Sequence, residues 1–259
     1  MALTPTIPTI IMFISMSTLL LIVGLNLLSK SIKSKIRNLA YLTAFHLGAA
    51  LAAFFQMFNS YSDEVIFNII VKGLYYLCVI FLSLFVRLTF YKDKKSPFVL
   101  IIIISTGVFI VSLIVGVINP TSLKDIYYFM GQFTLNILIM IAAYWYGFVA
   151  LKQYSSFKNQ NIQPWIKKRY LISSITSLCF ASSGLSSTII EIINWDLSIR
   201  IISILSLLIT TILLITFVIG SFLAWVMPER LKHFFNKDYH KTEEEELSEE
   251  EIMTQLKEG

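Results

Sequence analysis

The chain has 259 residues, of which 56% are hydrophobic and 14% are charged. Soluble domains carry roughly 25% charged residues, so this composition excludes an ordinary soluble protein and indicates an integral membrane protein. The net charge of +5 is unevenly placed, with acidic residues concentrated near the end of the chain and basic residues in a few short loops. Cys78 and Cys179 both lie in apolar runs, which indicates neither a disulfide framework nor a metal cluster.

Seven apolar stretches follow one another along the chain. A membrane-spanning helix needs about 20 mostly apolar residues, and the stretches that reach this length are residues 7–28, 39–58, 65–90, 98–118, 126–151, 170–193 and 197–227. The first lacks a basic region before it and is too long for a signal-peptide core, so we expect an uncleaved span. The sequence predicts an all-α integral membrane protein in which residues 1–227 form a seven-transmembrane helix bundle.

Lysine and arginine gather in every second connection. The connections after the first, third and fifth stretches hold Lys30, Lys33, Lys35, Arg37, Lys92, Lys94, Lys95, Lys152, Lys158, Lys167, Lys168 and Arg169. The opposite side of the membrane has only Lys124 and Arg200. The positive-inside rule therefore predicts an outer N-terminus and a cytoplasmic C-terminus in a multi-pass protein of the cell membrane.

Two further segments follow the seventh stretch. Residues 228–240 predict a basic amphipathic juxtamembrane helix at the membrane interface, whose surface residues are Arg230, Lys232, Phe234, Phe235 and Lys237. Residues 241–259 form an acidic cytoplasmic tail. Within it, Ser248 and Glu251 match a capping box, which indicates a short helix, and a solvated, mostly disordered tail is the alternative.

Lys72 lies inside the apolar run NIIVKGLYYLCV of the third stretch. It follows Glu64 by eight residues, which places it about 12 Å along the helix from the outer side. A lysine at that depth needs a partner or a water-filled cavity. Asn68, Tyr75 and Tyr76 share its helix face, because they lie four or fewer residues away at helical spacing.

Two interpretations of Lys72 stay open. In the first, an outward-facing pocket for a small ligand is lined by Asn68, Lys72, Tyr75, Tyr76, Gln132, Asn136, Glu191, Trp195 and Arg200. In the second, Lys72 extends toward Glu191 or Asp196 and fastens the helices together. Polar residues within a membrane are candidates for function, although hydrogen bonding between helices is their commoner use.

Other polar residues and missing motifs narrow the class. His46 lies on a stripe of small residues, which favours a hydrogen-bonded core residue over a proton relay. The sequence shows no Walker, HExxH or GxSxG motif, no lysine in the middle of the seventh stretch as a retinal protein requires, and no proline inside a span. We therefore expect no enzyme activity, no metal, no cofactor and no nucleic-acid partner, and the broken helices of transporters are unsupported.

Three stretches carry a family resemblance: KGLYYLCVIFLSLFVRLTFYKDKKSP, VINPTSLKDIYYF and KKRYLISSITSLCF. They resemble the N-terminal seven-helix sensor region of membrane histidine kinases, which passes a signal to a cytoplasmic kinase. Only a short segment follows the last stretch here, so the chain is more similar to stand-alone seven-helix proteins of archaea, whose tails read like WVMPERLKHFFNKDY before an acidic stretch. The layout also resembles seven-helix receptors with an eighth, interfacial helix. However, the Asp-Arg-Tyr motif of such receptors is missing at Arg87, which lies in VRLTF, and NPxxY is missing from the seventh stretch.

These observations favour a receptor-like sensor of the signalling type. We expect a small extracellular or lipid-phase ligand in the outer half of the bundle and a cytoplasmic protein partner, besides the lipid bilayer itself. A small-solute transporter or channel is one alternative, and a membrane scaffold that recruits partners through its tail is another. The sequence leaves the ligand, the partner and the oligomeric state open.

Overall fold

The computed structural model describes residues 7–59, 65–91, 94–118, 126–158, 160, 162–195 and 200–237. Its elements are α1 (Ile7–Ser34), α2 (Arg37–Asn59), α3 (Val65–Val86), the π-helix η1 (Arg87–Tyr91), α4 (Phe98–Ile118), α5 (Ile126–Phe157), α6 (Pro164–Trp195), α7 (Arg200–Trp225) and α8 (Glu229–Phe235). The described part contains helices and no strand, so the predicted all-α fold is confirmed. The acidic tail and its capping box lie outside the described residues.

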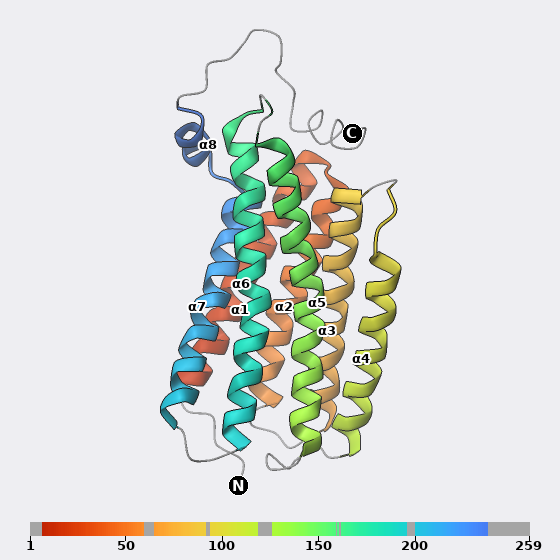
Figure 1. Ribbon diagram of the computed structural model, residues 1–259. Helices are drawn as coiled ribbons and strands as arrows, with labels where there is room; N and C mark the ends of the chain where they lie inside the picture. Colours follow the sequence, from red (N-terminus) through yellow and green to blue (C-terminus); the bar gives the residue numbers. More distant parts are fainter. Residues whose placement is uncertain are drawn as a thin grey trace.

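The seven long helices run alternately up and down in one bundle, and the short α8 lies at one end of it (Figure 1). Six described helices are long and apolar enough to cross a membrane, namely α1 to α5 and α7. These helices support a multi-pass membrane protein in contact with the lipid bilayer. The remaining long helix, α6, has 32 residues but a lower hydrophobicity, because it carries many serines.

Several helices extend beyond the apolar stretches that predicted them. α5 continues to Phe157 instead of residue 151, and α6 begins at Pro164 instead of residue 170. A hydropathy window ends where the side chains become polar, whereas a helix ends where its backbone hydrogen bonds end. At the other limit, α7 ends at Trp225, and Met227 adopts a left-handed conformation with φ of 38° just before Pro228.

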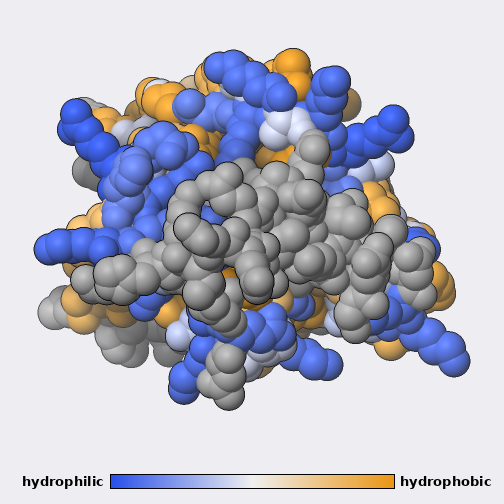
Figure 2. Space-filling view, turned by 90° about the horizontal axis from the view of Figure 1, so that it is seen from above, coloured by the Kyte–Doolittle hydropathy of each residue, from blue (hydrophilic) through white to orange (hydrophobic). Residues whose placement is uncertain are grey.

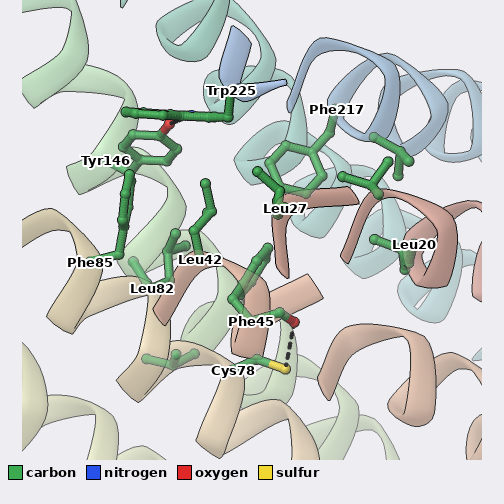
Figure 3. Packing of buried hydrophobic residues seen from close by; sticks show 14 of the residues in the cluster. Leu20, Leu27, Leu42, Phe45, Cys78, Leu82, Phe85, Tyr146, Phe217 and Trp225 are labelled. Carbon is green, nitrogen blue, oxygen red and sulfur yellow. Dashed lines mark hydrogen bonds between the residues drawn. The ribbon is translucent and has the colours of Figure 1, made fainter. Parts of the chain in front are cut away.

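The core of the bundle is made by α1, α2, α3, α5 and α7, which contribute large apolar side chains to one buried cluster. Figure 3 shows part of this cluster, including Leu27, Leu42, Phe45, Leu82 and Phe217. In contrast, α4 lies at the edge of the bundle and exposes many isoleucines and valines to the outside. An exposed apolar face of this kind is suited to lipid, because lipid tails are as apolar as the side chains.

Helices α5, α6 and α7 pack most closely through glycines. A Cβ atom on Gly220 of α7 would lie 1.9 Å from Cγ2 of Thr176 on α6. Ser174 and Ser177 of α6 donate hydrogen bonds to the carbonyls of Gly147 and Ala143 on α5, at 2.9 and 2.8 Å. These serines therefore satisfy their polar groups against a neighbouring backbone, as expected of close helix pairs in a membrane.

Candidate functional site

Lys72 is buried, with 3% of its surface exposed, and its Nζ donates a hydrogen bond to the carbonyl of Ser112 on α4 at 2.6 Å. The sequence did not indicate this partner, because a backbone carbonyl has no residue signature. The side chain of Glu191 and all of Asp196, the two predicted fasteners, lie outside the described residues. Within the described part, Lys72 therefore joins α3 to α4.

Tyr76 faces the same helix as Lys72. Its hydroxyl forms a hydrogen bond with Oγ1 of Thr106 at 2.7 Å, and its ring stacks on Phe109 with 4.4 Å between the ring centroids. Next to Thr106 in the chain, Ser105 is fully buried and its Oγ has no partner among the described residues. Lys72 and Tyr76 therefore make polar contacts between α3 and α4.

Tyr75 and Asn136 point elsewhere. Tyr75 lines a cavity of about 20 Å³ inside the bundle, together with Phe45, Cys78 and Phe180 among other apolar residues. The volume suffices for about one water molecule, but such a molecule would need polar partners. Asn136 of α5 donates to Oγ1 of Thr188 on α6 at 3.2 Å, away from α3.

The predicted pocket residues therefore have different neighbours. Lys72 and Tyr76 contact α4, Tyr75 lines a cavity in the core, and Asn136 contacts α6. Asn68 is half-buried on α3. Gln132, Glu191, Trp195 and Arg200 belong to described helices, but their side chains lie outside the described part. That all nine line one ligand pocket stays a prediction.

His46 is completely buried in α2, as expected of a hydrogen-bonded core residue. Its Nδ1 lies 2.8 Å from the carbonyl of Leu42, and since a carbonyl only accepts, Nδ1 carries the proton. The imidazole stacks on Phe217 of α7 with 5.8 Å between centroids, and Phe217 stacks in turn on Phe180 of α6 at 4.3 Å. Aromatic rings thereby join α2, α6 and α7 in the centre of the bundle.

A second group of side chains lies toward the α8 end, and we call it the arginine cluster: Arg169, Trp165, Trp225 and Tyr146. Arg169 is 3% exposed, and its Nε donates to the carbonyl of Ala224 at 3.1 Å. The guanidinium carbon lies 4.6 Å from the ring centre of Trp165 and 5.4 Å from that of Trp225. The last carbonyls of a helix lack partners within it, so Arg169 completes the end of α7 with a favourable charge.

The cluster continues into the core through Trp225. Its Nε1 donates to the hydroxyl of Tyr146 on α5 at 2.8 Å. Phe85 of α3 meets both rings edge-on, with centroid distances of 5.6 Å to Tyr146 and 5.0 Å to Trp225 (Figure 3). From the adjoining π-helix, Phe90 contacts Tyr146 at 6.2 Å. The arginine cluster therefore connects the ends of α6 and α7 with α3 and α5.

On its other side the cluster holds α8. The Nζ of Lys232 lies 5.0 Å from the ring centre of Trp165, and Oδ1 of Asn236 accepts the backbone N–H of Trp165 at 3.3 Å. This N–H belongs to the first turn of α6, where donors have no partner within the helix. Leu231 and Phe235 pack against the buried residues around Trp165. Helix α8 is therefore docked on the start of α6.

Some of the predicted membrane-surface residues contact other parts of the protein, and others are exposed. Lys232 forms an ion pair with Glu229 at 2.7 Å, and its hydrogen bond lowers the pKa of that carboxyl. Arg230, Phe234 and Lys237 are exposed, Phe234 by 70% of its surface. Lys232 is thus committed in part to Trp165 and Glu229, and the exposed three are the ones available to a membrane surface.

In the sequence, Arg169 is identified only as one of the basic residues of a connection. The run PWIKKRY places Trp165 and Arg169 four residues apart, hence on one face of a helix. That spacing, with a second tryptophan at the end of the seventh stretch, was the signal available in the sequence.

Comparison with known proteins found no matching protein family, no matching curated protein and no matching solved structure. Among the described residues, no group of three or more histidine, cysteine, aspartate or glutamate side chains could hold a metal ion.

Proposed function

We propose that the chain is a receptor-like membrane sensor with seven spans, an outer N-terminus and a cytoplasmic C-terminus. The observation that carries this proposal is the unbroken series of contacts from the core of the bundle through the arginine cluster to α8. A sensor needs such a connection, because a ligand on one side of the membrane must change a surface on the other. The resemblance to seven-helix sensor regions points the same way.

The length of α6 supports its membership of the seven spans. A helix of 32 residues is about 48 Å long at 1.5 Å per residue, and the hydrocarbon layer is about 30 Å thick. Its serines lower the hydrophobicity, but Ser174 and Ser177 are bonded to carbonyls of α5 and are not presented to lipid. A helix packed on many sides can cross a membrane with such a composition.

The distribution of charge supports the orientation. Seen from the α8 end, the molecule shows long hydrophilic side chains around its rim (Figure 2). Exposed lysines and arginines at this end come from the connections between α1 and α2, between α3 and α4, and between α5 and α6. The positive-inside rule assigns such an end to the cytoplasm.

The arginine cluster supplies the step from bundle to surface. A hydrogen bond from a charged group contributes about 1.5–3 kcal/mol, and each cation–π contact about 0.5–2 kcal/mol. Movement of α6 against α7 would separate Arg169 from Ala224 and Trp225, and α8 would lose its support on Trp165. Closely packed helices of this kind change between discrete arrangements, which turns a small shift into a defined signal. A ligand with an acceptor group near Lys72 would replace the carbonyl of Ser112 and move α3 relative to α4. Phe85 of α3 would pass this movement to Tyr146 and Trp225 in the arginine cluster.

A spin label on α8 tests the proposal. The label is placed at Phe234→Cys in protein whose Cys78 and Cys179 are replaced by alanine, reconstituted in lipid nanodiscs. We expect Lys72→Met to change the mobility of the label. The substitution alters the contact between α3 and α4, and the proposal states that this contact is coupled through the bundle to α8. The matched substitution Ile103→Met, at an exposed position of α4, should leave the spectrum as it was.

Arg169→Gln provides the second arm of this experiment. It should loosen α8 and remove the response to Lys72→Met, because the connection is then broken. If the label reports the same mobility in Lys72→Met as in the unchanged protein, the two ends are not coupled and the sensor proposal fails. Flux of small solutes into liposomes that contain the protein would instead favour a transporter.

A further inference from the structure

The α8 end of the molecule carries many exposed cations, which together we call the basic surface. Its exposed members lie in α1, α2, η1, α5, α6 and α8 and in the segments that directly follow α1, η1, α5 and α8: Lys33, Lys35, Arg37, Arg87, Lys94, Lys95, Lys152, Lys158, Lys168, Arg230 and Lys237. Figure 2 views this end directly and shows hydrophilic side chains extending from its edge in several directions. Charges of one sign gathered on a face produce a summed potential that attracts an acidic partner.

Little negative charge opposes this surface in the described part of the chain. At this end, the described carboxylate is that of Glu229, and it is engaged by Lys232 at 2.7 Å. Lys30 at the end of α1 also contributes to the low pKa of Glu229, so this carboxylate already serves two cations. Lys167 donates to the neutral carbonyls of Lys158 and Gln160, at 3.2 and 2.5 Å.

The chain itself contains the complementary segment. Residues 243–251 read EEEELSEEE, with seven glutamates among nine residues. They begin six residues after Lys237, which is the last described residue of the chain, and six extended residues reach about 20 Å. Both the segment and the basic surface therefore belong to the same end of the molecule.

We propose that residues 243–251 bind the basic surface. A short flexible tether gives the tail an effective concentration on the order of millimolar, so even weak ionic contacts suffice for binding. The tail would then act as an internal competitor, and any acidic partner must displace it. The proposal is independent of the proposed function, because it needs only that tail and surface share one end of the molecule.

The binding can be measured on the full chain by the mobility of a spin label at Met253→Cys, with Cys78 and Cys179 replaced by alanine. The protein is placed in nanodiscs of neutral phosphatidylcholine, so that lipid headgroups do not compete by charge. We expect a motionally restricted component at about 0.02 M salt that is lost at about 0.5 M, where the screening length falls from roughly 20 Å to a few ångströms. Restriction at low salt with loss at high salt supports an ionic contact.

Two variants identify the partners in that contact. Replacing the seven glutamates of residues 243–251 with glutamine should remove the restricted component. Replacing five basic-surface lysines with glutamine should have the same effect, the positions being Lys94, Lys95, Lys152, Lys158 and Lys168. A matched control is Arg200→Gln at the opposite end of the bundle, which should leave the component in place.

Three results would overturn the proposal. A label that is freely mobile at low salt shows that the tail is not bound. A restricted component that survives in the glutamine tail variant shows that something other than the glutamates holds it. A component that survives in the five-lysine variant shows that the tail binds elsewhere. Adding anionic lipid to the nanodiscs should release the tail, since headgroups then compete for the same cations.

Discussion

Gly220 marks the closest approach of α6 and α7, and Gly220→Ala is the sharpest perturbation the structure offers. The new Cβ would lie 1.9 Å from Cγ2, 2.8 Å from Cβ and 3.1 Å from Oγ1 of Thr176. Thr176 cannot simply rotate away without loss, because its Oγ1 donates to the carbonyl of Ile172 at 2.8 Å. Either that bond is broken or the two helices move apart, and separation would also pull Ala224 away from Arg169.

Overpacking of this kind costs about 1–3 kcal/mol. Since 1 kcal/mol shifts the melting temperature of a chain of this size by roughly 2–4 °C, we expect a decrease of several degrees. The buried Cys78 and the half-buried Cys179 provide the assay, because both thiols react with a fluorescent maleimide when the bundle opens. The melting temperature is read from the rise of this fluorescence in detergent.

Two further variants make the reasoning refutable. Thr176→Ser removes the methyl group at 1.9 Å and should restore much of the stability lost in Gly220→Ala. Gly107→Ala on α4 adds the same atom where nothing lies within 4 Å, and it should be neutral or stabilising by up to about 1 kcal/mol, because alanine favours a helix. The reasoning is refuted if Gly220→Ala has the same melting temperature as Gly107→Ala. It is also refuted if adding Thr176→Ser to Gly220→Ala does not raise the melting temperature.

Three other predictions concern the α8 end and the orientation of the chain. Trp225→Phe should lower stability by about 1 kcal/mol through loss of its bond to Tyr146, and Tyr146→Phe combined with it should cost little more, as a thermal double-mutant cycle would show. Lys237→Glu should weaken attachment of a peptide of residues 228–241 to anionic vesicles by roughly 1–2 kcal/mol, and unchanged sedimentation with the vesicles would exclude an interfacial role. A tag at Gly259 should be protected from protease in sealed right-side-out vesicles and one at Met1 cleaved, and the reverse pattern would invert the proposed orientation.

The helices were predictable because a chain in lipid must form its backbone hydrogen bonds within each spanning segment. Each span therefore needs a long, mostly apolar helix. The ends of the helices were less predictable: the polar residues between 151 and Phe157 continue α5 without any apolar signal. The π-helix Arg87–Tyr91 has a partner that is distant in sequence, since Asn38 of α2 donates to the carbonyl of Leu88 at 3.0 Å. No local pattern reveals such a contact.

For the candidate sites, the type of a residue and its neighbours in the sequence indicated whether it is buried. They did not indicate which group it contacts. Burial and hydrogen bonding of His46 followed from its small-residue stripe. The partner of Lys72 is the carbonyl of Ser112, and a carbonyl is present at every residue. Arg169 was hidden among loop cations that share its charge, and only the positions of Trp165 and Trp225 in space distinguish it.

The chain has four tryptophans, and their placement gives it an unequal optical response. Trp165 and Trp225 flank Arg169, and Trp145 donates to the hydroxyl of Tyr91 at the end of the π-helix, 3.4 Å away. Trp195 is the last residue of α6, at the opposite end. Three of the four tryptophans therefore make their contacts toward the α8 end. In a Trp195→Phe variant, a spectral change caused by an added molecule would report on that end alone.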